Sequence, residues 1–487
     1  MSHARKTPAR NPCPSGGRRL CRAVRNSALV AALVFAVLPG AAVGQTLYEA
    51  MSIAYDSNPR ILSERSRLRA TDESVPQALA GWRPTLEATG SLGRVRENRN
   101  RGVGTDYRTR FTTGIRVTQN LYEGGRTQAS IARAEADVLA GRAQLLSVEQ
   151  EVLLDVATSY LNVVRDREVL RLQIANERRL ERQLEATSDR FEVGEVTRTD
   201  VAQAESRLAR ATADRIASEA DLEVSAAFYE QVVGQVPGED MAYPEAEEPG
   251  LPATRDESSR LASERNPAVL SSFYERRSAQ RTVDQEFADL LPSLDVEGEL
   301  ERTRNVGADD RTIKSASVTA NVTIPIYQAG SETSEVREAK QLVRQANDRI
   351  ADARRQAVED ATSAWETLQS SRAQIIAFES AVRATGIALE GVEQEAAVGS
   401  RTVLDILDAE QEFLDAQVNL VRARRDVFVD GYSLLSAVGS LTARDLALPL
   451  QVYDEQEYYD QVRNLWWGLG ETPEPGVEEP ATVTPAE

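Results

Sequence analysis

The sequence predicts a mainly α-helical protein with some β-structure, built from two copies of one domain. Three observations predict this fold class: an internal repeat, two very long segments without proline, and four runs in which polar and apolar residues alternate. The repeat shows in Asn58-Pro59, which recurs as Asn266-Pro267, and in 121–125, which matches 326–330. Its period of about 205 residues is far longer than the roughly 20 to 50 residues of a solenoid unit. We therefore expect a duplicated domain.

The two copies and their connections follow changes in composition. We expect a first repeat at 45–236 and a second at 256–440, joined by a Pro- and Glu-rich linker at 237–255. Residues 441–470 form a C-terminal segment, and the acidic, Pro-rich tail at 471–487 is expected to be disordered. Each repeat has the expected order helix, strand pair, very long helix, helix.

Two long helices are predicted at 125–192 and 330–397, where about 67 residues contain no proline. At 1.5 Å per residue each would measure ~100 Å. Apolar residues recur at every seventh position of the first, which is typical of a coiled-coil seam: Leu139, Leu146, Leu153 and Tyr160. Four further helices are expected, at 47–81, 196–233, 256–290 and 401–438. An ordinary helical bundle is the alternative, but globular helices average only ~11 residues.

Four strands are predicted, at about 84–97, 106–121, 292–304 and 312–327. In the last of them Val318 and Ala320 alternate with Ser317 and Thr319, and each run has about the 9–11 residues of a transmembrane strand. A sheet packed on a soluble core is the alternative. Four strands cannot close a barrel, because the smallest barrels have about 8, so closure would need identical copies of the chain.

The strands carry two expectations about function. Acidic residues share the polar face of the runs, where they would line a lumen and favour cations: Glu87, Asp295, Glu297, Glu299 and Glu301. Trp82, Tyr122 and Tyr327 cluster at the ends of the strands next to the helices, where an aromatic membrane-interface belt would lie. Packing in a core is the alternative for each aromatic residue.

Residues 1–44 read as an export signal, with a basic start, the apolar run 28–38 and a small-residue cleavage site at 42–44. Both cysteines and the single histidine lie within it. The mature chain then lacks the side chains for a disulfide, a thiolate nucleophile, an imidazole base or an ordinary zinc site. It keeps 50 basic and 76 acidic residues, a net charge of −26 that disfavours nucleic acid as a partner. No segment after residue 44 is apolar enough for a transmembrane helix.

Three motifs together resemble the TolC-like family of outer membrane efflux channels. They are the Leu-Tyr-x-Gly-Gly turn at 121–125, the paired Val-Gly-x-x-x-x-x-Asp motifs at 193–200 and 398–405, and 401–409, which is similar to the second helix tip of that family. The resemblance covers about 45–450.

The resemblance implies a homotrimer in the outer membrane. Its twelve strands would form one β-barrel above a periplasmic α-barrel, with the linker and the C-terminal segment as equatorial parts. The helix tips would open when a periplasmic adaptor and an inner membrane pump or ABC transporter dock.

The resemblance also places the narrowest ring of the channel at Asp405 and Asp408. Their i, i+3 spacing puts both on one helix face, so a trimer would aim six carboxylates at its axis. Mutual repulsion should raise their pKa and make the ring attract cations. The alternative is that they are helix-start acids that interact with the helix dipole.

Contacts between the hairpins are implied to hold the tips shut. The matching positions are Arg401 on one hairpin and Thr199 with Asp200 on the other, which would form a charge-assisted latch. Ala396 stands where the family has an aromatic latch residue. The positions that match the adaptor-docking turns are Gly194, Glu195, Gly399 and Ser400.

The leading functional hypothesis is a passive trimeric duct without catalytic residues or cofactor. The alternative is a soluble periplasmic coiled-coil adaptor or scaffold. An exported hydrolase that uses carboxylates alone has little support, because the repeats leave no globular catalytic domain. The cargo stays open between drugs, other small molecules and secreted polypeptide.

Overall fold

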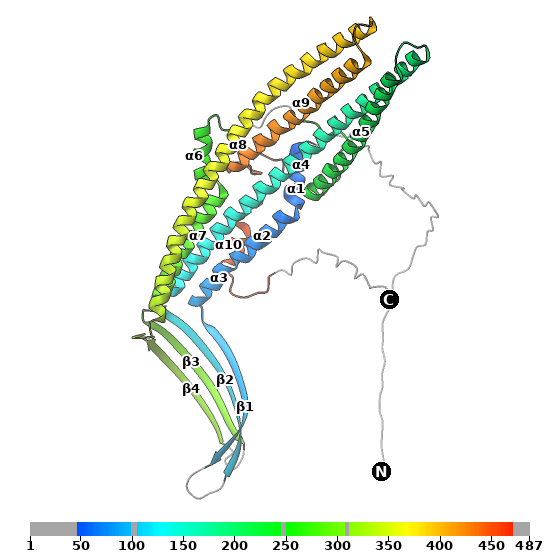
Figure 1. Cartoon of the computed structure of the whole chain (residues 1–487). Helices are drawn as coiled ribbons and strands as arrows, with labels where there is room; N and C mark the ends of the chain where they lie inside the picture. Colours follow the sequence, from blue (N-terminus) through cyan, green and yellow to red (C-terminus); the bar gives the residue numbers. More distant parts are fainter. Residues whose placement is uncertain (1–45, 99–104, 245–249, 307–310, 471–487) are drawn as a thin grey trace, which may run out of the picture. The chain divides into compact units, whose positions relative to one another are not determined.

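The computed structural model describes residues 46–98, 105–244, 250–306 and 311–470, which belong to one compact unit. The predicted export signal and acidic tail lie outside these residues. The fold class is confirmed, because the described chain is mainly helical, has four antiparallel strands and repeats one order of elements twice (Figure 1). None of the helices in the described ranges is both long enough and apolar enough to cross a membrane.

The first repeat contains α1 Leu47–Ser57, α2 Pro59–Asp72, α3 Ser74–Leu79, the short 3-10 helix η1 Ala80–Trp82, β1 Thr85–Asn98, β2 Thr105–Glu123, α4 Arg126–Glu192 and α5 Arg198–Val233. The second contains α6 Arg255–Arg265, α7 Pro267–Ala288, β3 Ser293–Val306, β4 Arg311–Thr323, α8 Ser331–Ala397 and α9 Val403–Ala437. The C-terminal segment adds α10 Glu457–Val462.

The two 67-residue helices, α4 and α8, each form a hairpin with the helix that follows, α5 or α9 (Figure 1). Both begin after a glycine in the left-handed region, Gly125 at φ 91° and Gly330 at φ 87°, where a side chain would be strained. Helix α9 also packs along α4, so the two hairpins lie against each other. This contact brings the two tips within reach of one another.

The predictions of one helix at 47–81 and one at 256–290 are wrong, because each is divided at its Asn-Pro pair. The residue before a proline avoids the helical conformation, and here it caps the next helix. The Asn58 side chain accepts from the Arg60 N–H at 2.9 Å and donates to the carbonyl of Val232 at 2.8 Å. In the second repeat the Asn266 side chain likewise donates to the carbonyl of Ala437 at 3.0 Å. Each break therefore ties the start of its repeat to the end of the return helix.

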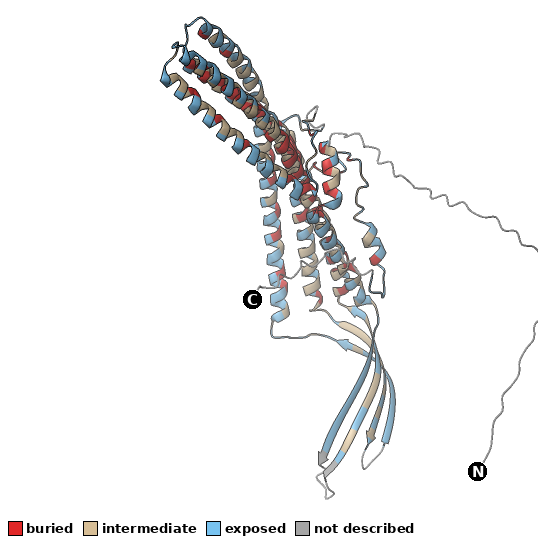
Figure 2. Cartoon of the chain, turned by 90° about the vertical axis from the view of Figure 1, so that its right-hand side faces the viewer, coloured by how far each residue is buried: buried red, intermediate tan, exposed pale blue. Residues whose placement is uncertain are grey.

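The four strands form one antiparallel sheet in the order β1-β2-β3-β4. Strand β4 ends at Thr323, four residues before the predicted end, since Pro325 has no N–H for the ladder. Strand β2 instead continues to Glu123, past an irregularity between Asn120 and Tyr122. No described strand residue is buried, whereas buried residues gather along the packed helices (Figure 2). The alternative of a sheet covered by a soluble core is therefore wrong for the single chain.

The main core lies where α1, α4, α5 and α9 meet the C-terminal segment. Three tyrosines there are almost wholly buried: Tyr160, Tyr229 and Tyr432. The Tyr160 hydroxyl donates to the carbonyl of Ala242 at 3.0 Å, which fixes the linker to α4. The buried carboxylate of Glu149 accepts from the N–H of Ala443 at 2.7 Å and fixes the C-terminal segment to the same helix. The core therefore unites both repeats with both connecting segments.

The C-terminal segment covers a buried carboxyl group on α2. Asp72 is 1% exposed, and neither of its oxygens has a hydrogen-bond partner among the described residues. Burial raises the pKa of Asp72 to about 6, against a smaller opposing effect of Arg142. The neighbouring Glu73 accepts a hydrogen bond from the Tyr458 hydroxyl at 2.8 Å. Asp72 therefore lies in a region where losing its proton is unfavourable.

We expect Asp72 to make the fold more stable as the pH falls from 7 to 4. Its folded pKa lies above the unfolded value, so the folded chain binds the proton more tightly between them. Relative to an Asp72→Asn variant, the native chain should gain roughly 2 to 3 kcal/mol over this range. Thermal unfolding followed by helical circular dichroism measures it. The exposed Asp56→Asn serves as the control, and equal pH profiles for all three proteins would contradict the assignment.

Candidate functional site

The tip of the first hairpin is a tight turn between α4 and α5. The chain leaves α4 through Gly194 at φ 82°, whose N–H donates to the carbonyl of Phe191 at 3.0 Å. Glu195 N–H donates to the carbonyl of Arg190 at 2.8 Å. Helix α5 then begins at a capping box, in which the Asp200 carboxylate accepts from the N–H of Thr197 at 2.8 Å.

The tip of the second hairpin has the same construction between α8 and α9. Gly399 has φ 80°, and the Ser400 N–H donates to the carbonyl of Glu395 at 3.0 Å. The Asp405 carboxylate accepts from the N–H of Thr402 at 2.9 Å, and the Thr402 hydroxyl accepts from the N–H of Asp405 at 3.3 Å. The four positions predicted as docking turns therefore do form the two turns at the tips.

Just behind the tips an apolar cluster joins the two hairpins. It contains Leu180 from α4, Ala211 and Leu208 from α5, and Val403 and Leu407 from α9. Leu407 is only 2% exposed. Removing such a leucine side chain costs about 2 to 5 kcal/mol, so the cluster is the main contact that keeps the hairpins together here.

An ion pair crosses between the same hairpins. Arg207 of α5 contacts the Asp408 carboxylate of α9 at 2.5 Å, and both side chains are partly exposed. Exposed pairs contribute about 0.2 to 1 kcal/mol, less than the apolar cluster. The pair places Asp408 at the contact between the hairpins.

The predicted latch between Arg401 and Asp200 is not formed within the chain. Arg401 binds Glu395 at 2.8 Å in its own hairpin. The Asp200 carboxylate is engaged by the N–H and hydroxyl of Thr197, both at 2.8 Å. The neighbouring Thr199 lies in the first turn of α5. An ion pair therefore occupies Arg401 and a capping box occupies Asp200, and Arg207 with Asp408 joins the hairpins instead.

The rise in the pKa of Asp405 is expected from repulsion in a trimer and stays a prediction; within the single chain, local hydrogen bonds act in the opposite direction. The hydrogen bond from the Thr402 N–H, followed by that from its hydroxyl, holds the pKa of Asp405 below its usual range. Thr197 does the same for Asp200. Within the single chain Asp405 therefore acts as a helix-start acid, as the alternative had it. Its charged carboxylate accepts the hydrogen bonds of the capping box.

Sequence reasoning missed two residues of this region. Arg207 shows no local motif, because its partner lies on another hairpin. Glu410 is 6% exposed, and burial raises its pKa while Arg179 lowers it less. Its counterpart in the first repeat, Glu205, is exposed. Both repeats have glutamate at this position, so the sequence contained no signal for the difference in burial.

The acidic residues of the strands do share one face of the sheet. Glu87 stands opposite Arg116 in the ladder, which in turn stands opposite Glu299. Arg116 contacts Glu297 at 2.6 Å and Glu299 at 3.0 Å. The two remaining acids accept hydrogen bonds from polar neighbours, Asp295 from Asn321 at 3.0 Å and Glu301 from Thr303 at 2.8 Å. This face is therefore polar but mixed in charge.

The aromatic residues at the helix-proximal ends of the strands are exposed, which contradicts core packing in the single chain. Trp82, in η1, and Tyr122, in β2, are each about half exposed, and Tyr327 follows β4 in irregular backbone. Arg83 lies over the Trp466 ring, 4.9 Å from its centroid, and donates to the carbonyl of Leu465 at 2.6 Å. Residues Leu465 and Trp466 of the C-terminal segment thus lie beside Arg83, next to the helix-proximal end of β1.

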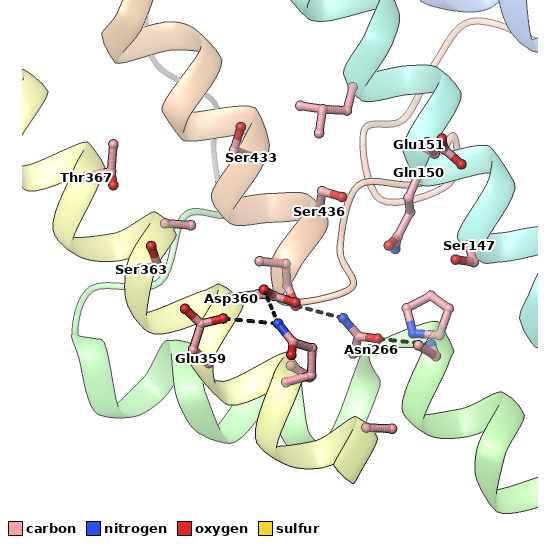
Figure 3. A pocket seen from close by; sticks show the side chains of 18 of the residues that line it. Ser147, Gln150, Glu151, Asn266, Glu359, Asp360, Ser363, Thr367, Ser433 and Ser436 are labelled. Atoms are coloured by element: carbon pink, nitrogen blue, oxygen red, sulfur yellow. Dashed lines mark hydrogen bonds between the residues drawn. The ribbon is translucent and has the colours of Figure 1, made fainter. Parts of the chain in front are cut away.

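A polar cavity of about 720 Å³ lies between α4, α7, α8 and α9 (Figure 3). Gln356 donates to Glu359 at 3.1 Å and to Asp360 at 2.9 Å, and Asn266 reaches the carbonyl of Ala437 across the cavity wall. The Gln356 contacts lie within α8, whereas the Asn266 bond connects the start of α7 to the end of α9. Within the described ranges, no group of three or more His, Cys, Asp or Glu side chains is arranged to hold a metal ion.

Comparison with known proteins decides the family. Residues 50–234 and 259–440 match the sequence profile described as outer membrane efflux protein, so the match includes both repeats. The chain belongs to this family. It is 36% identical over 449 residues to the outer membrane efflux protein BepC of Brucella suis biovar 1, covering 91% of this chain and 96% of BepC. It is 26% identical to the outer membrane protein TolC of Vibrio cholerae serotype O1, covering 84% and 94%.

The fold also matches solved structures. The Campylobacter jejuni CmeC outer membrane channel superposes with a TM-score of 0.73 at 17% identity, covering 86% of this chain and 89% of that one. As a member of the outer membrane efflux protein family, the chain is located in the outer membrane, and its family consists of channels rather than enzymes. The resemblance inferred from the tip motifs is therefore confirmed.

Proposed function

We propose that three copies of this outer membrane efflux protein form a passive exit duct that crosses the outer membrane and reaches into the periplasm. The main support for the proposal is the sheet, which within the described ranges is uncovered and has two unpaired edges. One of its faces is apolar and exposed, with Leu86 72% and Val318 81% exposed, and no other layer of the described chain covers it. Within the described chain β1 and β4 each pair on one side only. Three identical sheets would close twelve strands into a barrel and remove those edges.

In such a trimer the apolar face meets lipid and the polar face lines the lumen. The lumen would then contain Glu87, Asp295, Glu297, Glu299 and Glu301 with Arg116 among them. Trp82, Tyr122 and Tyr327 would form an aromatic belt at the periplasmic boundary of the membrane. The duct has no catalytic residues and needs no cofactor.

The helix tips form the gate of the proposed duct. Asp405 and Asp408 of three chains would surround its narrowest point with six carboxylates. The apolar cluster around Leu407 and the Arg207–Asp408 pair hold the hairpins of each chain together in the closed state. A periplasmic adaptor would bind the turns at Gly194, Glu195, Gly399 and Ser400, and an inner membrane pump or ABC transporter would deliver cargo.

Extraction from membranes separates this proposal from a soluble periplasmic adaptor or scaffold. A protein with a lipid-facing sheet should stay in the membrane pellet through washes with high salt and with carbonate, and leave it only with detergent. A scaffold held by polar contacts would leave in the salt wash. Release of most of the protein by salt alone would refute the duct.

A further inference from the structure

The apolar face of the sheet carries charge of one sign, and only at the end remote from the helices. The strand register puts even-numbered residues of β1, β3 and β4 on this face, together with the odd-numbered residues of β2 up to Gln119 and, past the irregularity, Tyr122. Five exposed basic residues lie there, which we call the basic collar: Arg94, Arg96, Arg302, Arg304 and Lys314. Among the described residues of this face none is acidic.

One cross-strand pair of the collar joins like charges, whereas the opposite face pairs unlike charges. There Arg116 contacts both Glu297 and Glu299. On the apolar face Arg302 stands directly opposite Lys314 in the ladder. Like charges in such a cross-strand pair repel each other. An anion from outside the chain would relieve this repulsion.

A depression of about 470 Å³ lies beside this pair. One side is apolar, with Ile115, Leu300 and Ala316, and the other contains Thr113, Arg302 and Lys314. The depression opens on the apolar face, because both walls are successive rows of that face. The row between them, Gly114, Glu301 and Ser315, supplies the floor, and strand alternation puts the side chains of Glu301 and Ser315 on the opposite face. The depression therefore places the cations of Arg302 and Lys314 next to an apolar wall.

The rest of the collar lies across the sheet and is held by an aromatic side chain. The guanidinium groups of Arg94 and Arg96 lie 5.4 Å and 5.8 Å from the centroid of the Tyr107 ring. Tyr107 is on the same face and is exposed. Stacking on the ring keeps both guanidinium groups at the surface, where they can donate hydrogen bonds to an anion.

We propose that the basic collar binds the phosphate groups of phosphorylated lipids in the outer leaflet of the outer membrane. The depression beside Arg302 and Lys314 holds the junction where a phosphorylated headgroup meets its acyl chains. Arginine and lysine suit phosphate, and Ile115, Leu300 and Ala316 suit the adjoining chains. Free phosphate would use the cations but leave the apolar wall unoccupied. The inference rests on the proposed duct, since that assembly turns this face toward lipid.

Titration of the detergent-purified protein with bis-phosphorylated lipid A tests the inference. Native mass spectrometry counts bound lipid for the native protein and for the double variant Arg302→Gln/Lys314→Gln. Each basic residue near an anionic lipid surface contributes roughly a fivefold change in affinity, so the variant should bind on the order of 30-fold more weakly. The matched control is Arg108→Gln/Arg110→Gln, which removes two cations from the opposite face of the same sheet and should change affinity less than twofold.

Two further probes identify the bound group. Lipid A without phosphates should bind as weakly to the native protein as intact lipid A binds to the collar variant. Inorganic phosphate at millimolar concentration should not displace intact lipid A. Equal weakening by both double variants, or equal binding of phosphorylated and dephosphorylated lipid, would overturn the inference. Particle mass and ion conductance are measured on the same samples: a conducting trimer without phosphate selectivity refutes only the collar, whereas a non-conducting single chain refutes the duct itself.

Discussion

Replacing Leu407 by aspartate is expected to open the proposed duct. Leu407 lies buried between the hairpins with Leu180 and Val403. Truncation of such a leucine costs about 2 to 5 kcal/mol, and an unpaired buried carboxylate adds several kcal/mol more. The hairpins should separate near the tips, and single-channel conductance in planar bilayers should rise several-fold.

A second leucine of the same helix provides the control. Leu404 is 38% exposed, so Leu404→Asp adds the same charge one turn earlier without disrupting the cluster. We expect its conductance to stay within a factor of two of the native value. If both variants conduct like the native protein, the apolar cluster does not hold the tips closed.

Replacing both aperture acids by asparagine is expected to remove most of the preference of the channel for cations. Asp405→Asn/Asp408→Asn deletes six carboxylates from the proposed ring, and unit charges a few ångströms from a permeating ion each contribute about 1 kcal/mol or more. The ratio of cation to anion permeability, taken from reversal potentials in a salt gradient, should fall on the order of tenfold or more. Conductance should change less than in Leu407→Asp, because the substitutions weaken the exposed Arg207–Asp408 pair and the cap of α9 but leave the apolar cluster intact.

Asp200→Asn is the matched control for this variant. Asp200 has the same place in the capping box of α5 that Asp405 has in that of α9. The substitution therefore weakens an equivalent cap without touching the ring. An equal loss of selectivity in Asp200→Asn would mean that the caps, rather than the ring, determine permeation.

The pH dependence of selectivity separates two effects on Asp405. Thr402 lowers the pKa of Asp405, so its charge should persist as the pH falls and be lost only below the usual value of about 3.9. Repulsion among six carboxylates acts in the opposite direction. Cation preference that survives to about pH 4 shows that the capping box dominates, whereas loss near pH 6 shows that repulsion does.

Local patterns were sufficient for the long helices and the turns at their ends. Helix α4 was predicted at 125–192 and spans Arg126–Glu192, because glycine at its start and a Val-Gly pair at its end are physical signals that act within a few residues. The strand faces followed from alternation for the same reason. The breaks at Asn58 and Asn266 also had a local cause, since proline disfavours helix at the residue before it.

Contacts between the hairpins were not predictable from local patterns. The Arg207–Asp408 pair depends on how far one hairpin is shifted along the other, and heptad spacing leaves that shift undetermined. The latch expected between Arg401 and Asp200 does not form within the single chain, because both side chains have nearer partners in their own hairpins. The threonine three residues before each aspartate was the available signal, as it is in any capping box.

We propose above all that three copies of the chain form one channel. The most direct test of this claim is the mass of the detergent-purified particle, corrected for bound detergent, measured together with ion conductance after reconstitution into planar bilayers. We predict a particle of three chains that conducts ions and prefers cations. A monodisperse single chain that stays soluble without detergent and produces no conductance would contradict the claim.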